Sequence, residues 1–152
     1  NFGSMNVLCA DKTGTLTEGR LHLHAALDID GQASKTVLLY AYLNACYETG
    51  FTNPIDEAIR THRQFDLSGY RKADEIPYDF LRKRLSILVA HDEMHLMVTK
   101  GALANVLAVC SSAETEGGIV DIGAVREPIQ KTQDRSLRST IRYRAIRESS
   151  RR

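Results

Sequence analysis

A short apolar segment that ends at an acidic residue places the strongest constraint on how this chain can fold. Residues 6–10 (NVLCA) are mostly apolar, and they are followed by Asp11 and by a polar segment that contains Gly14. An apolar run of this length, bounded by a turn, is typical of a buried parallel β-strand. The pattern therefore predicts that Asp11 lies at the C-terminal tip of a buried strand.

The segment that follows this strand, residues 11–17 (DKTGTLT), has residue types suited to phosphoryl chemistry. A carboxylate fixed at a strand end can attack phosphorus, because its position is set before the attack. Lys12 adds a cation that favours the ionised form of Asp11. Thr13 and its two neighbours offer hydroxyls and backbone groups to phosphate oxygens and to the ligand shell of magnesium. A polar turn without chemistry is the alternative interpretation.

The composition is that of a folded domain. The chain has 152 residues, of which 43% are hydrophobic and 26% are charged, and these proportions allow a buried core. No apolar run approaches the roughly 18 to 20 residues that cross a bilayer, so we expect no membrane span in this chain. Because residue 1 falls within an element, we also expect the chain to be part of a longer protein.

The C-terminal segment differs in charge from the rest. Residues 126–152 hold nine basic and three acidic residues, whereas the whole chain has a formal net charge of +1. Such a segment can bind nucleic acid by neutralising phosphates. The arginines are accompanied by a single aromatic residue, Tyr143, so we expect a disordered or helical tail at residues 136–152 and no nucleic-acid partner.

Local signals predict several helices and strands. Ser34 and Asn53 are expected to be helix N-caps, and Pro54 is expected at a first helical position. The helices are expected at residues 37–47, 53–65, 102–110 and 128–137, and the strands at residues 21–29, 85–90, 96–99 and 119–122. The strands at 85–90 and 96–99 are expected to form a hairpin with a polar tip.

The heptapeptide at residues 11–17 resembles the phosphorylation loop of P-type ATPases, the cation pumps that form an aspartyl-phosphate in each transport cycle. The resemblance implies that Asp11 accepts the phosphate and that Lys12 and Thr13 face the γ-phosphate of ATP. It also implies that Mg²⁺ is bound by the Asp11 carboxylate and the Thr13 backbone carbonyl. In that family the loop opens a phosphorylation domain with a haloacid-dehalogenase-like fold, and a nucleotide-binding domain is inserted directly after it.

The resemblance implies an α+β (α/β) fold and three parts. These are the first strand and loop of the phosphorylation domain at 1–18, a nucleotide-binding domain at 19–135 with an antiparallel sheet flanked by helices, and the arginine-rich tail at 136–152.

Residues 75–86 (EIPYDFLRKRLS) resemble the segment of that nucleotide-binding domain in which an aromatic residue lies eight residues before a serine. Counting back from Ser86 gives Tyr78. An aromatic ring in a cleft offers adenine a stacking face, and Lys83 can meet the negative charge of the nucleotide. A core role is the alternative for Tyr78, and for Phe80 we expect a core position.

Two further segments resemble the same domain. Lys100, Gly101 and Ala102 resemble its KGA motif, in which the lysine lines the nucleotide pocket and the glycine allows close backbone approach; a solvated lysine at a strand end is the alternative. Residues 53–59 (NPIDEAI) resemble its helix start beside the adenine site, which often carries an acid. This resemblance adds Asn53 and Asp56 to the expected nucleotide site. Asn53 departs from the family pattern there, and a capping role is the alternative.

Over about residues 1–135 the chain is similar throughout to bacterial magnesium-importing P-type ATPases. The resemblance implies a cytoplasmic part of a plasma-membrane pump, whose partners are ATP and the remaining phosphorylation, actuator and membrane domains. We expect the chain alone to bind ATP without turnover, because the family's later TGD and GDGxND motifs are absent from it. The alternatives are a stand-alone haloacid-dehalogenase-like phosphatase and a module that binds nucleotide without chemistry. Thr13 disfavours the phosphatase, since those hydrolases place a second aspartate there.

Overall fold

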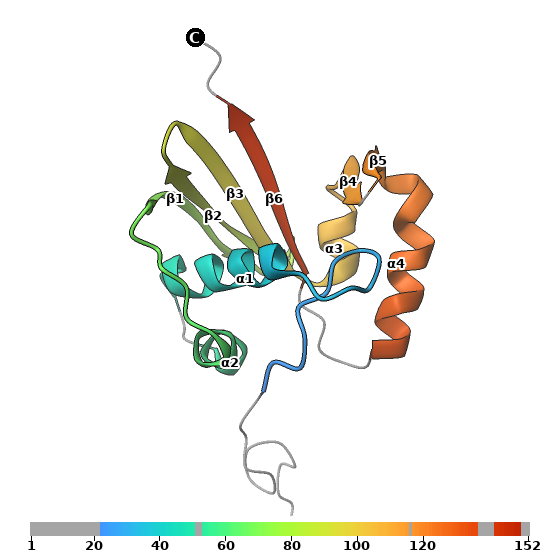
Figure 1. Cartoon of the computed structure of the whole chain (residues 1–152), viewed down its shortest axis with the longest axis horizontal. Helices are drawn as coiled ribbons and strands as arrows, with labels where there is room; N and C mark the ends of the chain where they lie inside the picture. The colour runs from blue at the N-terminus through green and yellow to red at the C-terminus, as the bar shows by residue number, and fades with distance from the viewer. Residues whose placement is uncertain (1–21, 51–52, 116, 137–141, 150–152) are drawn as a thin grey trace, which may run out of the picture.

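The computed structural model describes residues 22–50, 53–115, 117–136 and 142–149 (Figure 1). Asp11, Lys12 and Thr13 lie outside these residues, as does the predicted strand at 6–10.

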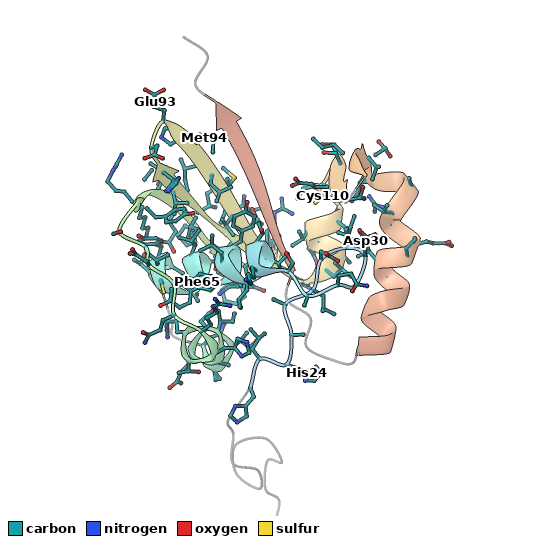
Figure 2. All side chains as sticks on the ribbon, in the orientation of Figure 1. His24, Asp30, Phe65, Glu93, Met94 and Cys110 are labelled. Atoms are coloured by element: carbon teal, nitrogen blue, oxygen red, sulfur yellow. The ribbon has the colours of Figure 1, made fainter. Side chains whose placement is uncertain are left out.

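A four-stranded antiparallel sheet forms the centre of the fold, in the order β1-β2-β3-β6. The strands are β1 (Tyr70–Asp79), β2 (Arg84–His91), β3 (Met94–Gly101) and β6 (Arg142–Ser149). The predicted β2–β3 hairpin is confirmed, with its tip at Asp92 and Glu93. Figure 2 labels Glu93 and Met94 at this tip, which lies at the end of the sheet opposite the β1–β2 turn.

The main core lies between the sheet and helix α1 (Lys35–Tyr47), which crosses one face of the sheet in Figure 1. Cross-strand register places Ile87 opposite Val98 and Val89 opposite Leu96, so these four side chains share one face. Together with Leu43 of α1 they form a cluster in which Leu96, at 8%, is the most exposed member.

Two helices begin where the local signals predict. The Ser34 hydroxyl accepts a hydrogen bond from the backbone N–H of Val37 at 3.3 Å, which caps α1. The Asn53 side chain accepts one from Ile55 at 2.7 Å and caps α2 (Pro54–His62), so the capping alternative for Asn53 is confirmed. Buried Asn44 donates to the Val98 carbonyl at 3.3 Å and ties α1 to β3.

A second group of elements packs around its own apolar cluster. Helix α3 (Leu103–Leu107), the hairpin of β4 (Ser112–Thr115) and β5 (Gly118–Asp121), and helix α4 (Ile122–Ser136) form this group. Leu103, Leu107, Ile122 and Ile129 make up its buried core. In Figure 1 the group lies on the β6 side of the sheet, away from β1.

The structure differs from three expectations for secondary structure. Residues 22–29 are not a strand; Leu27 forms an isolated bridge with Ala33, and the Asp28 carboxylate accepts backbone hydrogen bonds that close the intervening turn. Helix α4 begins at Ile122 rather than near Pro128, because the Asp121 carboxylate accepts the N–H of Gly123 at 2.8 Å at the helix start.

The third difference concerns the tail, where a disordered or helical segment is expected. Residues Arg142–Ser149 instead form β6, which pairs with β3 from Gly101↔Arg142 to Met94↔Ser149. Pairing with β6 satisfies the backbone groups along that edge of β3, which would otherwise be left open.

Among the described residues, no helix is both long enough and apolar enough to cross a membrane.

Candidate functional site

A pocket of about 470 Å³ lies between the α1–α2 connection, the β1–β2 turn and the C-terminal end of β3. Its lining residues come from these three segments and from the adjoining parts of β1 and β2: Glu48, Thr49, Gly50, Asn53, Glu75, Pro77, Tyr78, Phe80, Lys83, Leu85, Lys100, Gly101 and Ala102. Five of the six residues expected to bind nucleotide are among them: Tyr78, Lys83, Lys100, Gly101 and Asn53. Asp56, the sixth, does not line the pocket.

Asp56 instead forms an ion pair with Lys100, which does line the pocket. Lys100 is 5% exposed, and its Nζ donates to the two carboxylate oxygens of Asp56 at 2.7 and 2.8 Å. A third hydrogen bond runs from the same Nζ to the carboxylate of Glu48, the C-cap residue of α1. A buried ammonium needs such partners, because its desolvation is costly when it is unpaired. The predicted alternative of a solvated Lys100 is therefore wrong.

This arrangement uses all three donors of the Lys100 ammonium. Two carboxylates also face one cation, so the cluster carries a formal charge of −1 when all three groups are ionised. Lys83 differs, because its side chain is exposed and no ion pair of Lys83 occurs in the described part of the chain. Lys83 is therefore the pocket cation that can meet an anion without losing a partner.

Two aromatic rings stand beside each other in the pocket. Tyr78 is 48% exposed and Phe80 is 84% exposed. Their ring centroids are 5.2 Å apart and the ring planes meet at 85°, an edge-to-face contact. The expectation that Phe80 is a core residue is wrong, because the β1–β2 turn carries its side chain away from the core.

The β1–β2 turn is organised by Asp79. One oxygen of its carboxylate accepts hydrogen bonds from the backbone N–H groups of Leu81 at 2.8 Å and Arg82 at 2.9 Å. The other oxygen accepts a hydrogen bond from Nε of Arg82 at 2.7 Å. The backbone hydrogen bond from Arg82, followed by its side-chain hydrogen bond, lowers the pKa of Asp79 below its ordinary value. Lys83 completes the turn with a φ of 51°.

Gly101 lies where the end of β3 passes this turn. A Cβ at Gly101 would fall 2.6 Å from the Lys83 carbonyl oxygen and 2.8 Å from Cβ of Arg84. The end of β3 therefore packs closely against the turn that carries Lys83.

Glu75 joins β1 to the α1–α2 connection. Its carboxylate accepts the backbone N–H of Thr49 at 3.0 Å, the Thr49 hydroxyl and the ammonium of Lys72. Burial alone would raise the pKa of Glu75, but the hydrogen bonds from Lys72 and Thr49 outweigh it and hold this pKa below its ordinary value. Sequence reasoning missed Glu48, Thr49 and Glu75, because no local motif marks their approach to the pocket.

The predicted catalytic residues Asp11, Lys12 and Thr13 lie outside the described residues, so the phosphate-acceptor and magnesium-ligand predictions stay predictions.

Comparison with known proteins identifies the kind of chain that carries this pocket. No family model matches the sequence. The chain is 40% identical over 153 aligned residues to a protein of Escherichia coli (strain K12) named "Magnesium-transporting ATPase, P-type 1", and the match covers 96% of the chain. A protein of the same name from Salmonella typhimurium is 45% identical over 130 residues, or 80% of the chain. By sequence, the chain belongs with the P-type cation-transporting ATPases.

Other P-type ATPases are more distant; "Calcium-transporting ATPase 1" of Bacillus cereus is 25% identical over 140 residues. The matches cover 17%, 14% and 16% of these three relatives, so the chain spans about a sixth of their length. The antiparallel sheet flanked by helices is consistent with a fragment of the nucleotide-binding domain of a P-type ATPase.

Proposed function

We propose that this chain supplies the ATP pocket and the phosphate-accepting loop of a magnesium-transporting P-type ATPase. The observation that carries the proposal is the convergence of Tyr78, Lys83 and Lys100 on one pocket from two separate strands and a turn. Its volume of about 470 Å³ lies within the range of about 300–1,000 Å³ that is usual for small-molecule sites.

In this proposal the base of ATP stacks on Tyr78, whose ring is half exposed in the pocket. Stacking on an aromatic side chain contributes about 1–3 kcal/mol per base. Lys83 follows five residues later, on the β1–β2 turn, and meets the phosphates. Lys100 positions the pocket wall rather than the phosphates, since all its donors are engaged by Glu48 and Asp56.

The chemical step belongs to Asp11. In the whole pump its carboxylate oxygen forms a bond to the γ-phosphorus while the bond to the β–γ bridging oxygen breaks and ADP leaves. Asp11 and Thr13 would hold Mg²⁺, because a carboxylate and a backbone carbonyl are the oxygen donors that this cation takes. Bound Mg²⁺ offsets the charge on the phosphate oxygens.

The aspartyl-phosphate would couple ATP hydrolysis to magnesium transport through the actuator and membrane domains of the parent pump, with this segment on the ATP-bearing cytoplasmic side. For the chain alone we expect ATP binding without turnover. The relatives' names favour a pump over a stand-alone phosphatase.

Titration of the 152-residue chain with ATP, followed by calorimetry, tests the binding step. We expect measurable binding that Tyr78→Ala weakens about tenfold, the equivalent of about 1.4 kcal/mol. Equal affinity in the wild type and Tyr78→Ala would remove the stacking role. Steady ATP hydrolysis by the chain that Asp11→Ala abolishes would contradict the expected lack of turnover.

A further inference from the structure

Phe80 is a large apolar side chain that the fold leaves 84% exposed. Burying a phenylalanine side chain normally contributes about 1.5–3 kcal/mol relative to exposure. Phe80 makes little use of this contribution within the described residues, although it lines the pocket and contacts the Tyr78 ring.

The turn that carries Phe80 is held in place by its own hydrogen bonds. Phe80 is flanked by Asp79, whose carboxylate accepts the N–H groups of Leu81 and Arg82, and the Lys83 N–H donates to the Asp79 carbonyl at 2.6 Å. Because these hydrogen bonds fix the backbone of the turn, little backbone entropy is lost when a ligand contacts the ring. Little side-chain entropy is lost either, since phenylalanine has few rotatable bonds.

The two rings form a corner. Because their planes meet at 85° with centroids 5.2 Å apart, a flat base that stacks on Tyr78 lies roughly perpendicular to the plane of the Phe80 ring. Edge-to-face contact is a favourable arrangement for aromatic rings.

We propose that Phe80 is the second aromatic wall of the base pocket and that the Tyr78–Phe80 corner favours purine over pyrimidine nucleotides. The inference rests on the proposed function, because it assigns a further residue and a base preference to the same site. A two-ring purine extends far enough to contact both walls, whereas a single-ring pyrimidine stacked on Tyr78 leaves more of Phe80 uncovered.

Leu81 provides a matched control. It is 93% exposed on the same turn but does not line the pocket. A role of the exposed turn in contacting another domain of the pump would involve Leu81 at least as much as Phe80, whereas a role in base binding involves Phe80 alone.

The test compares the wild type, Phe80→Ala, Phe80→Leu, Leu81→Ala and Tyr78→Ala as full 152-residue chains. Calorimetry gives Kd for ATP, GTP, CTP and inorganic tripolyphosphate, and circular dichroism with thermal unfolding verifies folding. We expect Phe80→Ala to weaken the binding of ATP and GTP about tenfold. The binding of CTP should weaken less, and the binding of tripolyphosphate should not change. Phe80→Leu should recover part of the loss, and Leu81→Ala should bind like the wild type.

Wild-type affinity for ATP in Phe80→Ala, with weakened binding in Tyr78→Ala, would overturn the inference and leave the proposed function intact. Equal weakening in Phe80→Ala and Leu81→Ala would assign the effect to the turn as a whole and would also overturn it. Absence of nucleotide binding in the wild type would overturn the proposed function and this inference together.

Discussion

The ammonium of Lys100, at the end of β3, lies 2.7 Å from the carboxylate of Asp56 on α2, and both side chains are almost completely buried. The two residues are 44 positions apart in the sequence, and their pairing joins α2 to β3. It also fixes one wall of the pocket, because Lys100 lines the pocket and its ammonium is held by Asp56. Its removal should therefore affect stability first and nucleotide binding second.

Asp56→Ala should lower the free energy of unfolding by about 1–3 kcal/mol, since the buried Lys100 ammonium keeps Glu48 as a partner but loses the acceptor of two of its hydrogen bonds. Urea denaturation followed by circular dichroism measures this loss. Glu57→Ala is the control, because Glu57 is the next residue of α2 and is exposed. A similar loss in both variants would show that the helix, and not the ion pair, is responsible.

Sequence reasoning succeeded where the signal is local. Ser34 and Asn53 cap helices as predicted, because capping depends on a side chain and the backbone two or three residues away. The β2–β3 hairpin was also predictable, since its strands are adjacent in the chain and rich in apolar residues.

Strand β1 was not predicted. Its pairing with β2 has register shifts between Lys72 and Asp74 and between Ile76 and Asp79. Such irregularities interrupt the period-two alternation by which a strand is recognised. Strand β6 was missed because its arginines indicated a disordered or helical tail, whereas its pairing with β3 is a long-range property.

For the site, motifs identified the residues on β1, β3 and the turn between β1 and β2. They did not identify Glu48, which reaches Lys100 across 52 residues of sequence. This contact depends on the packing of α1 against the sheet, and no local pattern encodes it. Phe80 was assigned to the core because aromatic residues are usually buried, and the turn geometry reverses that assignment.

Glu48→Gln should strengthen ATP binding about threefold to tenfold. The substitution removes one of the two carboxylates around Lys100, so the formal charge of the cluster changes from −1 to 0 and repulsion of the phosphates decreases. Calorimetry at low and high salt measures the effect, which should shrink as salt screens the charges.

Glu114→Gln provides the control for Glu48→Gln. It makes the same charge change at an exposed position on β4, outside the pocket lining. Equal strengthening in both variants would indicate a general effect of net charge and would contradict the assigned role of Glu48.

Gly101→Ala should destabilise the chain by about 1–3 kcal/mol and weaken ATP binding. The added methyl group would lie 2.6 Å from the backbone oxygen of Lys83, so the β1–β2 turn must move. Because this turn carries Phe80 and Lys83, its displacement disturbs the pocket. Thermal unfolding and calorimetry measure the two effects.

Gly50→Ala is the matched control for stability, since a Cβ at Gly50 meets nothing within 4 Å. It should keep the unfolding temperature of the wild type. Unchanged stability in Gly101→Ala would mean that the β3 end and the turn separate at little cost, contrary to the close packing of Gly101 against Lys83 and Arg84.

Acidification should remove the stability that Glu75 contributes. Its pKa is lower in the folded state than the ordinary value of 4.5, because hydrogen bonds from Lys72 and Thr49 outweigh its burial. A group of this kind stabilises the fold above its unfolded-state pKa, and the contribution is lost as the pH falls through the folded-state pKa. The free energy of unfolding of the wild type should therefore exceed that of Glu75→Gln at pH 7, and the two curves should converge as the pH falls below 4.5.

Urea titrations at a series of pH values measure both curves. Glu57→Gln is an exposed control, and its difference from the wild type should stay small at every pH. A gap between the wild type and Glu75→Gln that keeps its size at acidic pH would show that shape, and not the charge of Glu75, holds the α1–α2 connection against β1.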